Sequence, residues 1–241
     1  MARVKPTGAR MKAYWDASAR RNAPWYVDTS LDYDNPDMDR FFETGRKIVA
    51  EALDESPVAP PGRSLAVEIG SGLGRVCAAL AERFDRVIGV DVSSEMTSRA
   101  RELVPDPRIT FAVGDGVSLS SLESGTADLV LTFTVFQHIP ETDVIAFYIE
   151  EAGRVLKKDG LFVFQWNNQP RPGAWRVKRV IMSVLQRVGL SRDRYRRHDP
   201  AFLGVRVPMV RIEEALHRGG LARRATKQEG TLWTWMWATR R

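Results

Sequence analysis

The chain has 241 residues, of which 44% are hydrophobic and 27% are charged, and its net charge is +6. This length can bury a large core without covalent staples, and the single cysteine, Cys77, excludes an internal disulfide and a cysteine-based metal cluster. No segment approaches the roughly 18 apolar residues of a membrane-spanning helix. The basic N-terminus is not followed by the apolar stretch of a secretory signal, so we expect a cytoplasmic protein without a transmembrane segment.

The first 36 residues are polar and aromatic and show no regular period, so we expect an irregular segment there. A helix is predicted next, with Asn35 as its cap and Pro36 in its first position. Apolar residues follow at helical spacing, and Gly45 occupies one of these positions as a site of close packing. A cluster of proline and glycine over 57–62 ends the helix.

From residue 65 the chain alternates short apolar strands with helices, which is typical of a parallel sheet covered by helices on both faces. The predicted strands span 65–69, 86–91, 108–113, 127–133 and 160–166. The predicted helices span 74–84, 94–103 and 141–157. The segment 114–126 is too rich in glycine and serine for a helix.

The C-terminal part predicts a helix over about 208–218 and then a hairpin formed by 221–227 and 231–240. In its second strand Trp233, Trp235 and Trp237 alternate with other apolar residues, so we expect this strand to be buried on both faces. A terminal hairpin that closes an otherwise parallel sheet is the simplest arrangement.

The residues that most clearly indicate ligand binding lie at the end of the first strand and in the turn after it, Val67-Glu68-Ile69-Gly70-Ser71-Gly72-Leu73-Gly74-Arg75. Its glycines let the backbone turn tightly against a ligand, and the following helix directs free N–H groups at that ligand. Nicotinamide and flavin enzymes use a similar turn, but Arg75 stands where their pattern requires a third glycine. Glu68 would repel a pyrophosphate, whereas it suits a ligand that carries a cationic ammonium and sulfonium.

Two aspartates follow the next two strands. Asp91 ends the second strand, where a carboxylate can accept hydrogen bonds from both hydroxyls of a ribose. Asp115 follows the third strand, within reach of an adenine amino group. Because the carboxyl ends of parallel strands meet at one edge of the sheet, Glu68, Asp91 and Asp115 are expected to face one crevice.

These motifs resemble the class I S-adenosylmethionine-dependent methyltransferase family. The likeness rests on 68–75, Val90-Asp91-Val92-Ser93, Gly114-Asp115-Gly116 and 127–140, and it covers roughly 38–166 and, more loosely, 208–241. It implies a Rossmann-like, seven-stranded, mostly parallel sheet with an antiparallel last strand. It also implies S-adenosylmethionine as cofactor, S-adenosylhomocysteine as product, and a cofactor site made of Glu68, Gly70, Ser71, Gly72, Gly74, Asp91, Val92, Gly114, Asp115, Gly116, Phe133 and Thr134.

The chain then divides into four parts: an N-terminal lid segment (1–37), a cofactor-binding core (38–166), an inserted basic lobe on the substrate side (167–207), and a last helix with the hairpin that completes the core (208–241). Nine basic residues and one acid lie within 170–197, and apolar residues from Val177 to Val188 recur at helical spacing. This basic amphipathic helix would cap the acceptor pocket, cover the domain or form an oligomer interface, or it would contact an anionic membrane surface, a carrier protein or RNA. Of these partners, nucleic acid is the least favoured.

Methyl transfer from a sulfonium is an in-line displacement, which an enzyme can promote by alignment and desolvation. The candidate base is His138, just past the fourth strand, and the alternative is that it only caps or packs there. Candidates on the substrate side are Tyr14, Trp15, Gln165, Asn167 and His198. No acidic or histidine cluster has the spacing of a metal site, so we expect none.

The sequence therefore predicts an enzyme that transfers a methyl group from S-adenosylmethionine to oxygen or nitrogen of a small-molecule acceptor, mainly by proximity and desolvation. One alternative is an acceptor that is RNA or is bound to a membrane or carrier. Another is a methyltransferase-like domain that binds without turnover. An NAD(P)-dependent oxidoreductase is a further alternative, which Arg75 and Glu68 disfavour.

Overall fold

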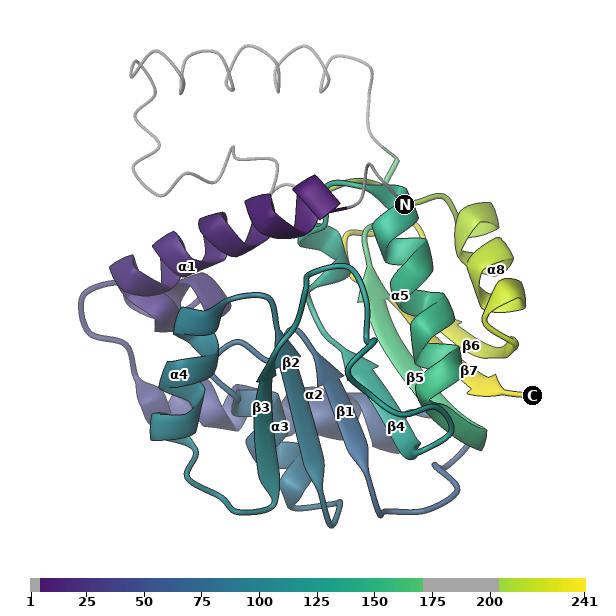
Figure 1. The fold of residues 1–241 in the computed structure, drawn as a ribbon, viewed down its shortest axis with the longest axis horizontal. Coiled ribbons are helices and arrows are strands. Elements are labelled where there is room, and N and C mark those ends of the chain that lie inside the picture. The colour runs from purple at the N-terminus through teal and green to yellow at the C-terminus, as the bar shows by residue number, and fades with distance from the viewer. Residues whose placement is uncertain (1–4, 171–203) are drawn as a thin grey trace.

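The structure is a computed structural model that describes residues 5–170 and 204–241. At its centre lies a seven-stranded sheet with the strand order β3-β2-β1-β4-β5-β7-β6 (Figure 1). The strands are β1 (Ala66–Ile69), β2 (Val87–Asp91), β3 (Ile109–Val113), β4 (Ala127–Thr132), β5 (Leu156–Trp166), β6 (Leu221–Lys227) and β7 (Thr234–Arg240). Strands β1 to β5 are parallel, and β7 runs antiparallel to its neighbours β5 and β6. The predicted Rossmann-like sheet with an antiparallel last strand is confirmed.

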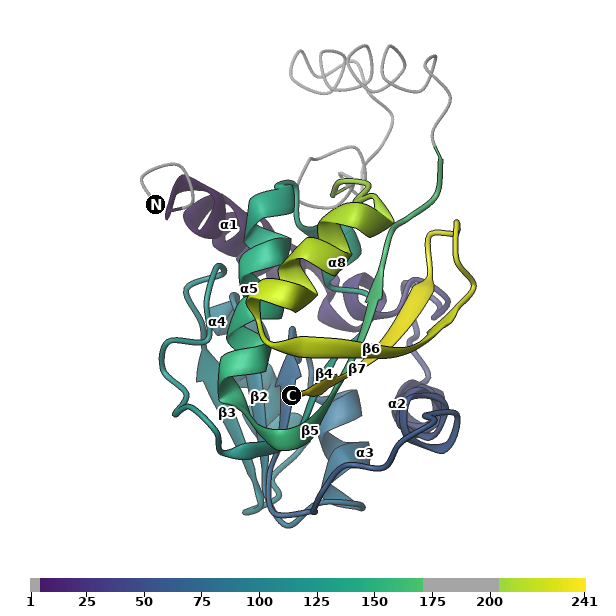
Figure 2. The ribbon, with the colours of Figure 1, turned by 90° about the vertical axis from the view of Figure 1, so that its right-hand side faces the viewer.

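Helices cover both faces of this sheet, as the strand pattern predicts. On β5, Phe162, Phe164 and Trp166 join one core cluster, and the alternating Leu161 and Val163 join the other. The first cluster includes buried residues of α5 (Thr142–Val155) and α8 (Met209–Arg218), and the second includes those of α2 (Met38–Asp54), α3 (Arg75–Ala81) and α4 (Ser94–Leu103). Figure 2 shows α5 and α8 side by side on one side of the sheet.

The α2 helix begins two residues later than the sequence predicts. Its N-cap is Asp37, whose side chain accepts a hydrogen bond from the backbone N–H of Arg40 at 2.9 Å. The predicted cap, Asn35, and Pro36 therefore precede the helix. Gly45 fulfils its predicted role, because a Cβ atom at this position would lie 2.2 Å from the backbone oxygen of Arg75. A side chain there would force α2 away from α3.

The expectation of an irregular N-terminal segment is wrong. Residues Lys5–Val27 form the helix α1, which is interrupted at Asn22, where the backbone is extended. Thr7, Met11, Tyr14 and Ser18 form a buried stripe at helical spacing. Two of its four members are small polar residues, and this composition hides the helical period from a reading of hydrophobic positions.

The remaining differences are local. The β5 strand begins at Leu156 instead of residue 160, and Trp233 precedes β7 and is half exposed, whereas Trp235 and Trp237 are buried as expected. No helix forms within 114–126. The predicted basic helix and His198 lie outside the described residues, and the four-part division of the chain stays a prediction. Among the helices of the described ranges, none has the length and apolar character needed to span a membrane.

Candidate functional site

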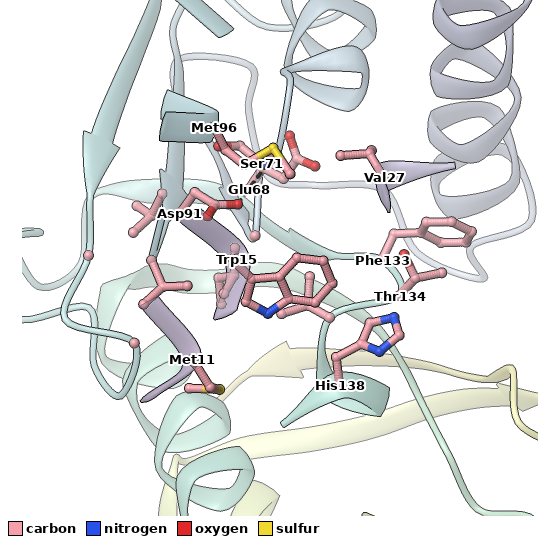
Figure 3. Close-up of a pocket in the computed structure, with 18 of the residues that line it drawn as sticks. Met11, Trp15, Val27, Glu68, Ser71, Asp91, Met96, Phe133, Thr134 and His138 are labelled. Carbon is pink, nitrogen blue, oxygen red and sulfur yellow. Dashed lines mark hydrogen bonds between the residues drawn. The ribbon is translucent and has the colours of Figure 1, made fainter. Parts of the chain in front are cut away.

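A cavity opens at the carboxyl edge of the sheet, with α1 lying across that edge (Figure 1). The space inside it, including its open mouth, is about 970 Å³. The loops after β1, β2, β3 and β4 supply most of its wall, and α1 supplies the cover with Met11, Trp15, Tyr26 and Val27 (Figure 3). The crevice expected from the strand order is therefore present.

The loop between β1 and α3 forms the floor of this cavity. Gly70 has a φ of 78°, which favours glycine, and a Cβ atom there would lie 2.1 Å from a methyl group of Val135. Its N–H donates to the backbone oxygen of Val90 at 2.7 Å, which ties the loop to β2. The backbone of Gly70, Ser71 and Gly72 thus lies directly on the cavity.

Asp91 joins the glycine loop to the start of α4. One carboxylate oxygen accepts a hydrogen bond from the N–H of Gly72 at 2.8 Å, and the other accepts from the N–H of Ser93 at 2.8 Å. Burial raises the pKa of this carboxyl group, against the effect of the two backbone donors. Since each carboxylate oxygen has two acceptor positions, Asp91 can still accept hydrogen bonds from a ligand in the cavity.

Glu68 contributes a carboxyl group that is almost entirely buried, with 4% of the residue exposed. The thiol of Cys77 donates to its Oε2 at 2.9 Å. Burial raises the pKa of Glu68 to about 8, assisted by the charge of Asp91 and opposed by Cys77 and Arg75. A nearby cation would stabilise the ionised form, so this carboxyl group is suited to a positively charged ligand.

The segment after β4 forms the opposite wall, with Phe133, Thr134 and His138 on the cavity (Figure 3). Thr134 has a φ of 55°, which is rare for a β-branched residue and places its backbone in a strained left-handed conformation. His138 ends the short 3₁₀ helix η1 (Phe136–His138), and its ring meets the ring of Trp15 edge-on at a centroid distance of 5.5 Å. The imidazole thus connects the segment after β4 to α1.

Residues 67–164 match a family model described as a methyltransferase domain. This match, together with the similar proteins described next, supports the class I S-adenosylmethionine-dependent methyltransferase family. The chain is 34% identical over 122 residues to an uncharacterised 37.1 kDa protein in transposon TN4556 of Streptomyces fradiae, an alignment covering 49% of this chain and 33% of that protein. It is 34% identical over 110 residues to the trans-aconitate 2-methyltransferase of Methylobacterium radiotolerans, covering 44% of this chain and 40% of the relative. The matched region thus spans less than half of either relative.

Among solved structures, the magnesium protoporphyrin IX methyltransferase of Synechocystis with bound S-adenosylhomocysteine is similar to this chain, with a TM-score of 0.63. The alignment covers 98% of this chain and 100% of that one, at 17% identity. At this level of identity the likeness concerns the fold. It agrees with the strand order and with the antiparallel β7.

Two of the residues predicted to bind cofactor do not line the cavity of this methyltransferase domain. Asp115 directs its carboxylate into its own turn, where it accepts from the N–H groups of Val117 and Ser118 at 2.8 and 2.7 Å. Gly74 caps α3, and a Cβ atom there would meet the ring of Phe111 at 2.7 Å. The other predicted cofactor residues do line the cavity: Glu68, Gly70, Ser71, Gly72, Asp91, Val92, Gly114, Gly116, Phe133 and Thr134.

Of the predicted substrate-side residues that the structure describes, only Trp15 lines the cavity. Tyr14 is buried and packs edge-on against Trp15, with a centroid distance of 5.2 Å. Gln165 is buried on β5, and its side-chain oxygen has no hydrogen-bond partner among the described residues. Asn167 is also buried, and its side-chain oxygen accepts from the N–H of Gln169 at 3.1 Å.

Several wall residues were not predicted, because their spacing in sequence carries no signal of a common site. Among them are Met11, Tyr26, Val27, Met96 and Tyr148. Tyr148 projects from α5 and is buried, and this burial raises the pKa of its hydroxyl group. Of these residues, only Met11 could have been indicated by a sequence pattern, because it belongs to the buried helical stripe of α1.

Arg75 ties the end of α1 to the glycine loop. Its guanidinium donates to Asp28 at 2.5 Å and to the hydroxyl of Thr44 at 2.7 Å, and it lies over the ring of Phe41. The side chains of Arg75 and Asp28 are only 8% and 12% exposed. The residue that distinguishes this loop from a dinucleotide-binding turn is therefore part of a largely buried ion pair.

Further along α1, Asp16 accepts hydrogen bonds from the hydroxyl of Ser93 at 2.7 Å and from the N–H of Glu95 at 3.3 Å. Arg20 forms an ion pair with Glu95 at 3.0 Å. These contacts attach α1 to the first turn of α4. The cover of the cavity is thus attached to the same segment that follows Asp91.

Proposed function

We propose that this domain binds S-adenosylmethionine in the cavity and transfers its methyl group to oxygen or nitrogen of a small-molecule acceptor. The observation that carries the proposal is the convergence of the glycine loop, Glu68 and Asp91 on one cavity beneath α1. Similar proteins are named for small acceptors, namely trans-aconitate, magnesium protoporphyrin IX and, at 20% identity and a TM-score of 0.56, the 7-oxygen of mitomycin.

The wall of the cavity fits this cofactor on two counts. The hydroxyl oxygen of Ser71 is buried and has no hydrogen-bond partner among the described residues, as expected of a group that awaits a polar ligand. Glu68 is a buried carboxyl group whose ionised form lacks a full countercharge, because Arg75 is paired with Asp28. A cation in the cavity would supply that countercharge.

The proposed contacts follow from these positions. Glu68 would face the ammonium group, Asp91 would accept hydrogen bonds from the ribose hydroxyls, and the backbone at Gly114 and Gly116 would border the adenine. The backbone of Phe133 and Thr134 would border the methionine end. When bound, the sulfonium supplies an electrophilic methyl group whose transfer requires no acid for the leaving sulfur.

The protein's own residues would align the acceptor and exclude water. Trp15, Tyr26 and Phe133 surround the cavity with aromatic surface, which favours a desolvated acceptor. His138 lies on the same wall, and it would take the proton from a hydroxyl or ammonium acceptor. For an acceptor that is already deprotonated, alignment alone suffices.

Calorimetric titration with S-adenosylmethionine, S-adenosylhomocysteine and NAD tests the cofactor assignment. We expect the first two to bind at one site per chain and NAD to show no binding. Binding of NAD without binding of the sulfonium would overturn the proposal.

The acceptor class requires a turnover assay with the tritiated methyl donor. Panels of small carboxylic acids, phenols and amines are compared with total RNA and with acceptors in anionic vesicles. Methylation confined to RNA or to vesicle-bound acceptors would contradict a free small-molecule acceptor. Cofactor binding without transfer to any panel would favour a non-catalytic binding domain.

A further inference from the structure

The single cysteine of the chain contacts one of the two acidic residues that line the cavity. The Sγ of Cys77, in the first turn of α3, lies 2.9 Å from Oε2 of Glu68 on β1. Cys77 is fully buried, and Glu68 is 4% exposed. The contact therefore lies behind the cavity wall, out of reach of solvent.

The neighbouring strand leaves room for this thiol through a glycine. At Gly89 on β2, a Cβ atom would lie 2.6 Å from Sγ of Cys77 and 2.8 Å from the Cβ of Ser71. A side chain at this position would therefore force the sulfur or its surroundings to shift. The packing of β2 against α3 thus holds the thiol at hydrogen-bonding distance from the carboxyl group.

The thiol acts on Glu68 as a donor. Burial and the adjacent Glu68 charge raise the pKa of Cys77 well above its usual range, so the sulfur keeps its proton. The other charged groups that act on Glu68 are Arg75, which stabilises the carboxylate, and Asp91, which destabilises it. The guanidinium of Arg75 is directed to Asp28. Among the described residues, the Cys77 thiol is the side chain that donates a hydrogen bond to the Glu68 carboxyl group.

We propose that Cys77 is a positioning residue, whose thiol orients the Glu68 carboxyl group and favours its ionised form for the ammonium group of the cofactor. The role of Glu68 as ligand rests on the proposed function. The effect of the thiol on Glu68 exists in the ligand-free protein, and it can be measured there. A free thiolate or a thiol exchange reaction has no part in it, because the sulfur is buried and protonated.

The test compares Cys77→Ala with Cys77→Ser. Both variants remove the sulfur and leave a similar space, but only serine retains a donor at this position. The titration of Glu68 is followed in ligand-free protein by carbon-13 NMR of labelled glutamate carboxyl groups, with Glu68→Gln to assign the resonance. We expect Cys77→Ala to raise the pKa of Glu68 by about one unit, and Cys77→Ser to restore most of that shift.

Cofactor binding gives the second readout. Near pH 7, a rise of one unit in the pKa of Glu68 lowers the ionised fraction about tenfold, so we expect Cys77→Ala to bind S-adenosylmethionine up to about tenfold more weakly than wild type. The difference should disappear above about pH 9.5, and Cys77→Ser should follow wild type. A purely structural defect would weaken binding equally at all pH values.

An unchanged Glu68 titration in Cys77→Ala would overturn the inference, and so would equal affinities of Cys77→Ala and wild type across the pH range. A Cys77→Ser variant that behaves like Cys77→Ala in both readouts would also overturn it. If wild type does not bind S-adenosylmethionine, the proposed function fails, whereas the titration of Glu68 still decides whether the thiol acts on it.

Discussion

Replacement of Glu68 by glutamine removes a buried ionisable group and keeps its shape and its ability to accept from the Cys77 thiol. In the folded wild type the pKa of Glu68 is about 8, against 4.5 for an unperturbed glutamate. Between these values the folded chain keeps the proton and the unfolded chain has lost it, so the folded state becomes less stable as the pH rises. Below pH 4.5 and above pH 8 the contribution of this group no longer changes.

The size of the effect follows from the two pKa values. Since one pKa unit corresponds to 1.36 kcal/mol, the wild type should lose about 2 kcal/mol of unfolding free energy from this group between pH 6 and pH 8. The glutamine variant has no such pH-dependent contribution to its free energy of unfolding. Other groups titrate in both proteins, and their contributions cancel when the two are compared.

Urea unfolding of both ligand-free proteins at pH 6 and pH 8 measures this difference. The free energy of unfolding of Glu68→Gln relative to wild type should rise by about 2 kcal/mol between these pH values, and the melting temperature by roughly 4–8 °C. The same variant should bind S-adenosylmethionine more weakly, because it lacks the carboxylate proposed to face the ammonium group. The carboxyl group of Glu68 would then lower the stability of the free protein and contribute to binding of the ligand. A difference in unfolding free energy that stays constant between pH 6 and pH 8 would refute the reasoning.

Three further predictions concern the cavity and its cover. Asp91→Asn should weaken S-adenosylmethionine binding roughly ten- to a hundredfold by calorimetry, because an amide cannot replace the charged acceptor. Asp143→Asn, at an exposed position on α5, should leave binding unchanged. His138→Ala should lower kcat about a hundredfold or more for a hydroxyl acceptor and leave the cofactor Kd unchanged; an unchanged kcat would exclude a role as base. Arg75→Ala should lower the free energy of unfolding by about 3 kcal/mol in urea, since Asp28 would remain buried without its cation, and a loss below about 1 kcal/mol would contradict the importance of this pair.

The strands and the helices between them could be predicted because each carries its own local pattern. Hydrophobic runs on β1, β2 and β4 are buried on both faces, and the helices between them show a regular apolar stripe. The α1 helix was missed because Thr7 and Ser18 occupy half of its buried stripe. Their burial depends on the loops that α1 covers, and those contacts are remote in sequence.

The residues of the candidate site also fall into those that the sequence could predict and those that it could not. Its glycine loop and its two acids, Glu68 and Asp91, could be placed from sequence, because the ends of parallel strands meet at one edge. The direction of the Asp115 side chain could not, since a local turn competes with the cavity for its oxygens. Nor could Tyr148 or Met11, which reach the cavity only through packing of α5 and α1. The binding roles themselves stay predictions until tested.

The insertion of β7 between β5 and β6 has a consequence for the order of assembly. Until Thr234–Arg240 have been synthesised, β6 has no partner in the sheet, and β5 presents an unpaired edge whose residues include Phe162 and Phe164. Strand pairing on this side can therefore be completed only after Thr234–Arg240 have left the ribosome. A nascent or truncated chain that ends before β7 would carry a long apolar edge, and such edges recruit other chains into aggregates.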